Sequence, residues 1–158
     1  MAQKDKLFTP FVLPISVGED VSFPNHDSIK HHVYSFSSAK RFELKIYLDE
    51  KHPPITFDKP GVVEMGCNIH DWMLSYLVVV DTPYYSTSNI NGTAELTLER
   101  GNHTLFVWHP RLNDKSEPIS LEVDTDTQSS LTFQIEQTLL PEVVQSKPTT
   151  RQVHYDQY

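Results

Sequence analysis

Three side chains that bind soft metal ions lie within one short segment, GCNIHDWM, at positions 66–73. They are Cys67, His70 and Met73, and Cys67 is the only cysteine in a chain of 158 residues. A thiolate, an imidazole and a thioether together select a soft or borderline metal ion, copper above all. A loop between two neighbouring strands can bring all three side chains to one point at this spacing. The segment therefore predicts part of a metal site.

A second imidazole is needed to complete the kind of copper site that has two histidines, one cysteine and a weak axial methionine. The remaining histidines are His26, His31, His32, His52, His103, His109 and His154. His31 and His32 open the run HHVYSFS, and side chains alternate along a strand, so only one of the two can enter a site. Hydrophobic phasing favours His32, because His32, Tyr34 and Phe36 form the more apolar face. Both histidines stay open at this point.

The rest of the chain must hold these ligands in place, and its pattern is that of strands and turns. β-Branched and aromatic residues are concentrated in segments bounded by Gly, Pro and Asn; these segments are 8–17, 21–23, 31–37, 42–48, 61–66, 74–81, 93–99, 103–109, 118–123 and 131–137. No window shows a sustained helical period. Turns recur about every eight to twelve residues, which is typical of a β-sandwich. Residues 139–158 read as a polar, flexible tail.

Composition and charge narrow the classes of partner. The formal net charge is −8 with scattered basic residues, and this argues against a nucleic-acid partner. A partner with a basic surface is favoured, because opposite charges speed encounter. No apolar run reaches the length of a membrane span. The start MAQKDKL suggests an initiator Met placed before the mature N-terminus of an exported protein whose signal peptide has been removed.

Two blocks of sequence, VSFPNHDSIKHHVYSFS and FDKPGVVEMGCNIHDWM, resemble the cupredoxins, and in particular plastocyanin, amicyanin and the plastocyanin-like "methylamine utilization" proteins of bacteria. In plastocyanins an Asn lies six positions before the first histidine ligand, which is followed by any residue and then Val; Asn25, His31 and Val33 match this pattern. Pro60-Gly61 matches the lead-in to the ligand loop. The Cys-x2-His-x2-Met spacing is the short loop of amicyanin. The resemblance covers residues 8–82.

This resemblance implies an all-β fold, a cupredoxin-like Greek-key β-sandwich over residues 1–82 with a C-terminal β-strand extension. Residues 83–138 would form the extension, as four strands that resemble the hairpins of transthyretin-like or carboxypeptidase-regulatory domains, and 139–158 the tail. The resemblance also implies one copper ion with four ligands, His31, Cys67, His70 and Met73. It thereby favours His31 over His32.

Several neighbours of the ligands follow from the same resemblance. Asn25, His32 and Asp71 would surround the site, and Trp72 would form part of a docking face beside His70. Two of these depart from the family pattern. His32 stands where an Asn often ties the two ligand loops together, and its ring N–H could replace that tie. Asp71, beside a ligand, would favour Cu(II) and lower the reduction potential.

The implied function is the transfer of single electrons by an outer-sphere mechanism, without enzymatic activity. The expected partner is a redox protein such as a c-type cytochrome or a dehydrogenase, and the expected compartment is the periplasm. Three alternatives remain. The first is a periplasmic copper-binding, delivery or sensing protein without electron transfer. The second is a red-copper enzyme in which Glu43 or Asp71 replaces Met73. The third is a binding or assembly module that works through residues 83–138.

Overall fold

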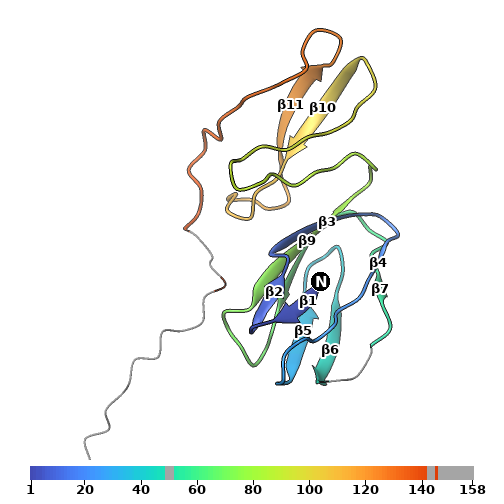
Figure 1. Ribbon diagram of the computed structural model, residues 1–158, viewed down its shortest axis with the longest axis vertical. Helices are drawn as coiled ribbons and strands as arrows, with labels where there is room; N and C mark the ends of the chain where they lie inside the picture. The colour runs from blue at the N-terminus through green and yellow to red at the C-terminus, as the bar shows by residue number, and fades with distance from the viewer. Residues whose placement is uncertain (49–51, 142–144, 146–158) are drawn as a thin grey trace, which may run out of the picture.

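The computed structural model describes residues 1–48, 52–141 and 145. Within these residues it contains strands and turns but no α-helix, so none that could cross a membrane. The tail expected over 139–158 lies almost entirely outside the described residues. Figure 1 shows a sandwich of strands from the first half of the chain and a smaller pair, β10 and β11, above it.

One layer of the sandwich is a five-stranded sheet with the strand order β3-β9-β8-β5-β6. Its members are β3 (Val12–Ser16), β5 (His31–Ser35), β6 (Phe42–Tyr47), β8 (Gly61–Gly66) and β9 (Leu74–Val80). β3 runs parallel to β9, and the other neighbours are antiparallel. The ladder between β8 and β9 is continuous, so the loop that joins them is anchored on both sides.

The second layer is built from two short strand pairs. β1 (Ala2–Lys4) pairs with β2 (Leu7–Thr9), and β4 (Asp20–Val21) pairs with β7 (Ile55–Thr56). A parallel bridge between Gln3 and Asn25 connects β1 to the segment that follows β4. It is supported by backbone hydrogen bonds from Gln3 to Pro24 (2.9 Å) and from His26 to Gln3 (2.8 Å).

The hydrophobic core fills the space between the two layers. Phe8, Val21 and Phe57 contribute from the second layer and its flanks, and Val33 and Leu77 contribute from the five-stranded sheet. This arrangement buries the inner faces of the two layers. The predicted all-β sandwich is confirmed.

The C-terminal extension contains fewer strands than the sequence predicts. β10 (Asn102–Val107) and β11 (Ile119–Asp124) form one antiparallel pair. The segments 93–99 and 131–137 alternate in hydrophobicity, but the structure assigns neither of them to a strand. The expectation of four strands is therefore wrong for the described residues. Alternation alone does not make a strand, because a strand also needs a partner for its backbone hydrogen bonds.

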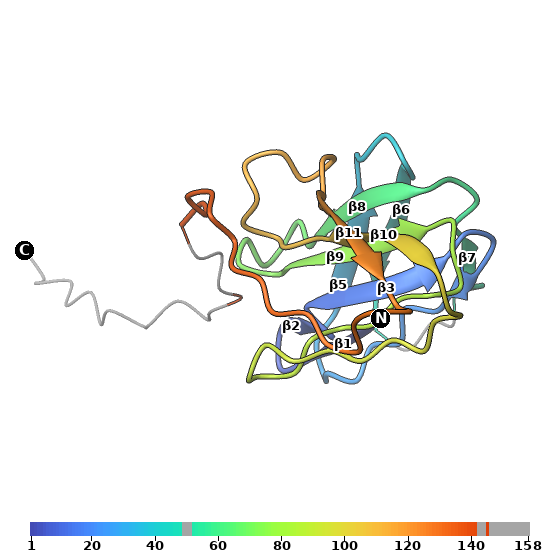
Figure 2. The same ribbon diagram turned by 90° about the horizontal axis from the view of Figure 1, so that it is seen from above.

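A small contact surface joins the extension to the sandwich. The Trp108 ring packs edge-on against Tyr76 of β9, with 5.5 Å between ring centroids. Lys115 lies 3.7 Å from the carboxylate of Glu64 on β8, and Leu112 is buried. Figure 2, seen from above, shows the β10–β11 pair crossing over β9. The extension thus covers part of the outer face of the five-stranded sheet.

Candidate metal centre

The loop that joins β8 to β9 carries the cysteine and one histidine of the site. Cys67 follows β8 directly and is 3% exposed, within the same core cluster as Val63 and Met65. The backbone N–H of Met73 donates to the carbonyl oxygen of His70 at 2.9 Å, which closes a turn. This turn lets a loop of few residues fold back on itself, so that Cys67 and His70 face each other.

Gly66 allows this loop to lie close to β5. A Cβ atom at Gly66 would be 3.0 Å from Cζ and the hydroxyl oxygen of Tyr34. Within the described strands, β8 and β5 pair through Gly66 and Tyr34. The glycine therefore brings the cysteine-bearing end of β8 next to the histidine-bearing strand.

Three candidate ligand atoms meet inside the sandwich. The donor atoms of His31, Cys67 and His70 all lie within 4.8 Å of one another. Cys67 Sγ is 3.6 Å from His70 Nδ1, and the ring centroids of His31 and His70 are 4.9 Å apart. Two imidazoles and one thiol at this separation can bind a single metal ion.

His31 is held by one ring nitrogen and leaves the other free. Its Nε2 lies 2.7 Å from Asp27 Oδ2. A carboxylate can only accept a hydrogen bond, so Nε2 carries the proton and Nδ1 carries the lone pair. Nδ1 is buried without a hydrogen-bond partner. A buried nitrogen without a bonding partner costs free energy. A metal ion bound to Nδ1 would be such a partner.

Asp27 is ionised in this arrangement. Burial alone would raise the pKa of its carboxyl group, but hydrogen bonds from the Lys6 backbone N–H, the His31 ring and the Asp5 backbone N–H lower it below the usual value. Sequence reasoning missed Asp27. The only available signal was a carboxylate four positions before His31 in the run NHDSIKH.

His70 is suited to binding a metal as a neutral ring. Burial, together with the nearby His31 and Lys6, lowers the pKa of His70 below its usual value. The ring lies beside Trp72, with 5.3 Å between centroids. His70 is half-buried, whereas His31 is fully buried. His70 is therefore the candidate ligand nearer to solvent.

The structure distinguishes the two adjacent histidines. His31, Val33 and Ser35 are 0%, 0% and 1% exposed, so they form the inner face of β5. Phe36, on the face predicted to be the more buried, is 75% exposed. The phasing argument for His32 is therefore wrong. It failed because the inner face of β5 carries two polar residues, His31 and Ser35.

His32 and Glu43 form a pair of their own. His32 Nε2 lies 2.9 Å from Glu43 Oε1 on β6, so the structure ties His32 to a neighbouring strand and not to the ligand loop. The Glu43 side chain is 61% exposed, and Asp71 is exposed as well. The cluster of His31, Cys67 and His70 includes neither carboxylate.

The structure also shows the surroundings of Met73, Asn25 and Trp72. Met73 is 1% exposed and packs in the core cluster that contains Cys67. Asn25 shapes the loop before His31: its Oδ1 accepts the N–H of Asp27 at 2.9 Å, and its Nδ2 donates to the carbonyl of Ile29 at 2.9 Å. Trp72 is half-buried, and its Nε1 donates to the carbonyl of Lys6 at 3.0 Å.

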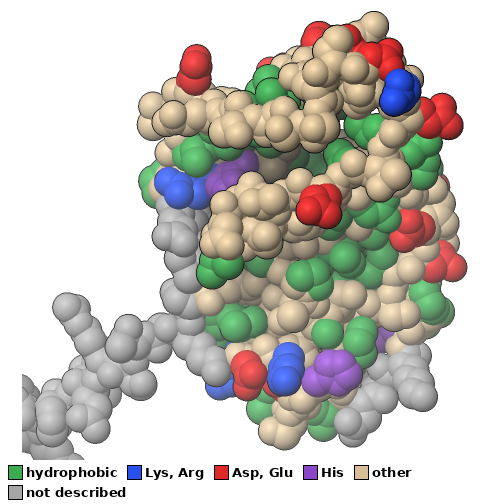
Figure 3. Space-filling view, turned by 45° about the horizontal axis from the view of Figure 1, so that its top comes forward, with side chains coloured by type: hydrophobic (Ala, Val, Ile, Leu, Met, Phe, Trp, Pro, Cys, Tyr) green, Lys and Arg blue, Asp and Glu red, His purple; other side chains and the backbone are tan. Residues whose placement is uncertain are grey.

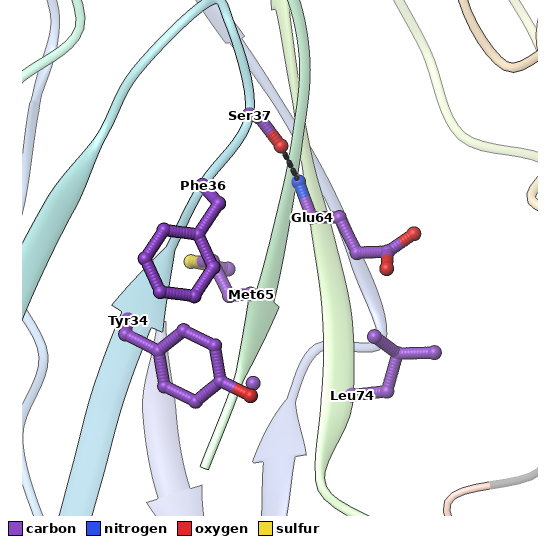
Figure 4. A pocket seen from close by; sticks show the side chains of 7 residues that line it. Tyr34, Phe36, Ser37, Glu64, Met65 and Leu74 are labelled. Carbon is purple, nitrogen blue, oxygen red and sulfur yellow. Dashed lines mark hydrogen bonds between the residues drawn. The ribbon is translucent and has the colours of Figure 1, made fainter. Parts of the chain in front are cut away.

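A separate pocket opens between β5 and β8 (Figure 4). The rings of Tyr34 and Phe36 lie along one side, and Glu64 and Leu74 lie on the other. The Ser37 hydroxyl oxygen accepts the N–H of Glu64 at 2.9 Å and closes one end. No cysteine or histidine lines this pocket, so it is not the metal centre.

On the face of the described residues seen in Figure 3, basic side chains do not form a cluster. Figure 3 shows acidic side chains mainly near the upper and right margins of one face, with basic side chains scattered singly. Phosphate binding would need a cluster of basic side chains. Hydrophobic side chains form separate patches on the same face.

Similarity to known proteins is found among solved structures. No protein-family model and no curated protein sequence matches the chain. Among solved structures, the copper-containing nitrite reductase (NirK) from Thermus scotoductus SA-01 is similar, with 26% identity and a TM-score of 0.48. The similarity covers 51% of this chain but only 22% of the reductase chain.

Amicyanin structures are similar over the same share of the chain. A reduced tryptophan-to-tyrosine mutant of amicyanin has 21% identity and a TM-score of 0.45, and an oxidised methionine-to-leucine mutant has 18% identity and a TM-score of 0.46. Each match covers 50% of this chain and 78% of the amicyanin chain. The strand order of the five-stranded sheet and the cluster of His31, Cys67 and His70 are observed in this chain itself. The chain has a two-layered β-sandwich with a His-Cys-His group that could hold one metal ion.

Proposed function

We propose that this protein binds one copper ion through His31, Cys67, His70 and Met73 and carries single electrons between redox partners. The observation that supports the proposal best is the buried His31 Nδ1, which has no partner and belongs to the cluster within 4.8 Å. A thiolate with two imidazoles is a donor set that suits copper. Met73, buried in the same core cluster, adds a weak thioether ligand.

Bound copper would supply a one-electron couple between Cu(I) and Cu(II). The chain's part is to keep its ligands in one arrangement, so that little has to move when the electron transfers. Three features of the described residues support this. His31 is fixed by Asp27, Cys67 follows a paired strand, and the turn between His70 and Met73 is closed by a hydrogen bond.

The electron would leave through His70. This ring is the more exposed of the two imidazoles, and it lies against Trp72. Ile69, next to it, is 44% exposed. An apolar rim around an exposed ligand edge suits brief docking, in which partners approach closely without a large interface. Trp72 would form part of that rim.

The partner and the compartment follow from charge and resemblance. A net charge of −8 favours a redox protein with a cationic docking face, because such charge speeds encounter at low ionic strength. A c-type cytochrome or a dehydrogenase fits that description. The periplasm is the proposed compartment. The protein itself would perform no catalysis, although one structurally similar protein is a nitrite reductase.

The test is the absorption and EPR spectrum of the protein loaded with one equivalent of Cu(II). We expect an intense blue thiolate-to-copper band and narrow copper hyperfine splitting. Cys67→Ser should abolish the band, and His31→Ala should change both signals, whereas the matched variant His32→Ala should change neither. A colourless complex with ordinary hyperfine splitting would overturn electron transfer and favour copper delivery or sensing. A red or yellow complex would remove Met73 from the ligand set.

A further inference from the structure

We infer that the turn at Asp5–Lys6 is a clamp that positions both histidine ligands, with Asp27 as its positioning carboxylate. The inference rests on the metal site proposed above. It assigns a role to residues of the second layer, which contribute no ligand. None of these residues was singled out by the ligand motifs, because the turn lies more than twenty positions before His31 in the sequence.

The turn joins β1 to β2 through two residues with positive φ. Asp5 has φ 57° and Lys6 has φ 60°. Two such residues make the tight hairpin whose twist matches that of the flanking strands. This conformation turns both backbone N–H groups to the same side. They donate to the two oxygens of Asp27, from Asp5 at 2.6 Å and from Lys6 at 2.8 Å.

The contact with Asp27 fixes the first histidine. One carboxylate receives three hydrogen bonds, two from the turn and one from His31 Nε2 at 2.7 Å. The carboxylate therefore cannot rotate without losing at least one of them. With Nε2 committed as the donor, His31 presents Nδ1 to the cluster. A carboxylate that holds the far nitrogen of a ligand imidazole sets both its tautomer and its ring orientation.

The same turn reaches the second histidine from the other side. The carbonyl oxygen of Lys6 accepts a hydrogen bond from Trp72 Nε1 at 3.0 Å. The Trp72 ring lies 5.3 Å from the His70 ring, centroid to centroid. Lys6 thus contacts the His31 side through its N–H and the His70 side through its C=O. One residue of the second layer links both ligand segments of the five-stranded sheet.

A purely structural role for these contacts makes a different prediction. If Asp27 only capped the hairpin, its removal would lower the stability of the metal-free protein and leave the bound copper unchanged. If it positions His31, its removal must also change the affinity for copper and the spectrum of the copper site. Loss of such a supporting partner typically lowers metal affinity by about 10- to 100-fold.

The experiment compares four variants with the wild-type protein by competitive Cu(II) titration and EPR. We expect Asp27→Ala to weaken copper binding by about 10- to 100-fold and to change the hyperfine splitting. Asp27→Asn keeps an acceptor oxygen. Its copper affinity should therefore lie between that of Asp27→Ala and that of the wild type. Trp72→Phe removes the indole N–H but keeps an aromatic ring at this position. It should change the copper affinity and the hyperfine splitting in the same direction as Asp27→Ala, but less.

The control is Asp58→Asn, which makes the same charge change at an exposed carboxylate that pairs with Lys40 at 3.0 Å. It should bind copper as the wild type does. Copper binding and EPR that are unchanged in both Asp27→Ala and Trp72→Phe would overturn the clamp while leaving the proposed function intact. Failure of the wild type to bind copper would instead overturn the function. If Asp27→Ala does not fold, Trp72→Phe alone decides.

Discussion

The sandwich and the C-terminal extension differ in how much of their apolar surface they bury. Of the fully buried apolar side chains in the described residues, all but Leu112 belong to the sandwich. The extension instead exposes large apolar side chains such as Ile90 at 101% and Phe106 at 63%. The sandwich has two layers around a core, whereas the extension has a single pair of strands.

This difference explains where the metal centre can be built. Ligands held at fixed separation need side chains whose positions are set by packing on all sides. The inner face between the layers provides that setting for His31 and Cys67. A lone strand pair is marginally stable by itself, so the extension depends on its contact with β8 and β9.

The largest expected difference in the free energy of unfolding is between two alanine substitutions, of one leucine in each region. Leu77 is fully buried in β9, whereas Leu131 is 43% exposed in the extension. Leu77→Ala should lower the free energy of unfolding by about 2–5 kcal/mol, because it removes packed methyl groups from a closed core. Leu131→Ala should change it by less than about 0.5 kcal/mol. Urea denaturation of both variants measures this, and equal effects would contradict the comparison.

The next effect concerns the attachment of the extension. Leu112 is 1% exposed, so Leu112→Ala should loosen the extension and make segment 83–100 more sensitive to limited proteolysis. The copper spectrum should not change, because the site lies within the sandwich. A change of the spectrum in this variant would show that the two regions are coupled. Leu96→Ala, at a position 37% exposed, is the matched control.

A smaller loss of stability is expected when a tyrosine inside the sandwich is replaced. The Tyr47 hydroxyl donates to the side chain of Gln3 and lies 2.6 Å from the carbonyl of Phe23. Tyr47→Phe should therefore cost about 0.5–1.5 kcal/mol at neutral pH. Burial raises the pKa of Tyr47 from 10.0 to about 12.

That pKa shift also predicts the pH dependence of stability. A raised pKa means that the folded protein holds its proton more tightly than the unfolded chain. Stability is therefore full below pH 10.0 and falls as the pH rises toward about 12. In Tyr47→Phe this alkaline loss should be smaller than in the wild type, measured by thermal unfolding across that range. Tyr76 has a similarly raised pKa of about 12, so part of the loss should remain.

The smallest effect is expected at the edge of the contact between the regions. Lys115 lies 3.7 Å from Glu64, and both side chains are partly exposed. Exposed ion pairs contribute little, so Lys115→Met should change the free energy of unfolding by less than about 1 kcal/mol. A larger loss in denaturant titration would show that this ion pair, and not Leu112, holds the extension in place.

Part of the cluster could be predicted from sequence because its chemistry is local. Cys67 and His70 lie within one short loop, and the structure places both in one cluster with His31. His31 needed the match to a family pattern, because hydrophobic phasing pointed to His32. Phasing assumes that the inner face is the more apolar one. The inner face of β5 breaks that assumption, because it buries the polar side chains of His31 and Ser35.

The role of Asp27 and the number of strands in the extension could not be predicted, for a different reason. The role of Asp27 depends on the turn at Asp5–Lys6, a contact between distant parts of the chain that no local pattern reveals. Segments 93–99 and 131–137 have the alternation of strands but form no strand in the structure. Pairing depends on which segment lies alongside, and alternation carries no information about that.

The most direct test of the central claim is X-ray absorption at the copper edge in both oxidation states. For a single-electron carrier held by this sandwich, we predict one sulfur from Cys67 and two histidine nitrogens in Cu(II) and in Cu(I), with nearly the same distances. Loss of a histidine nitrogen on reduction, or loss of the metal itself, would contradict an electron carrier and indicate copper delivery.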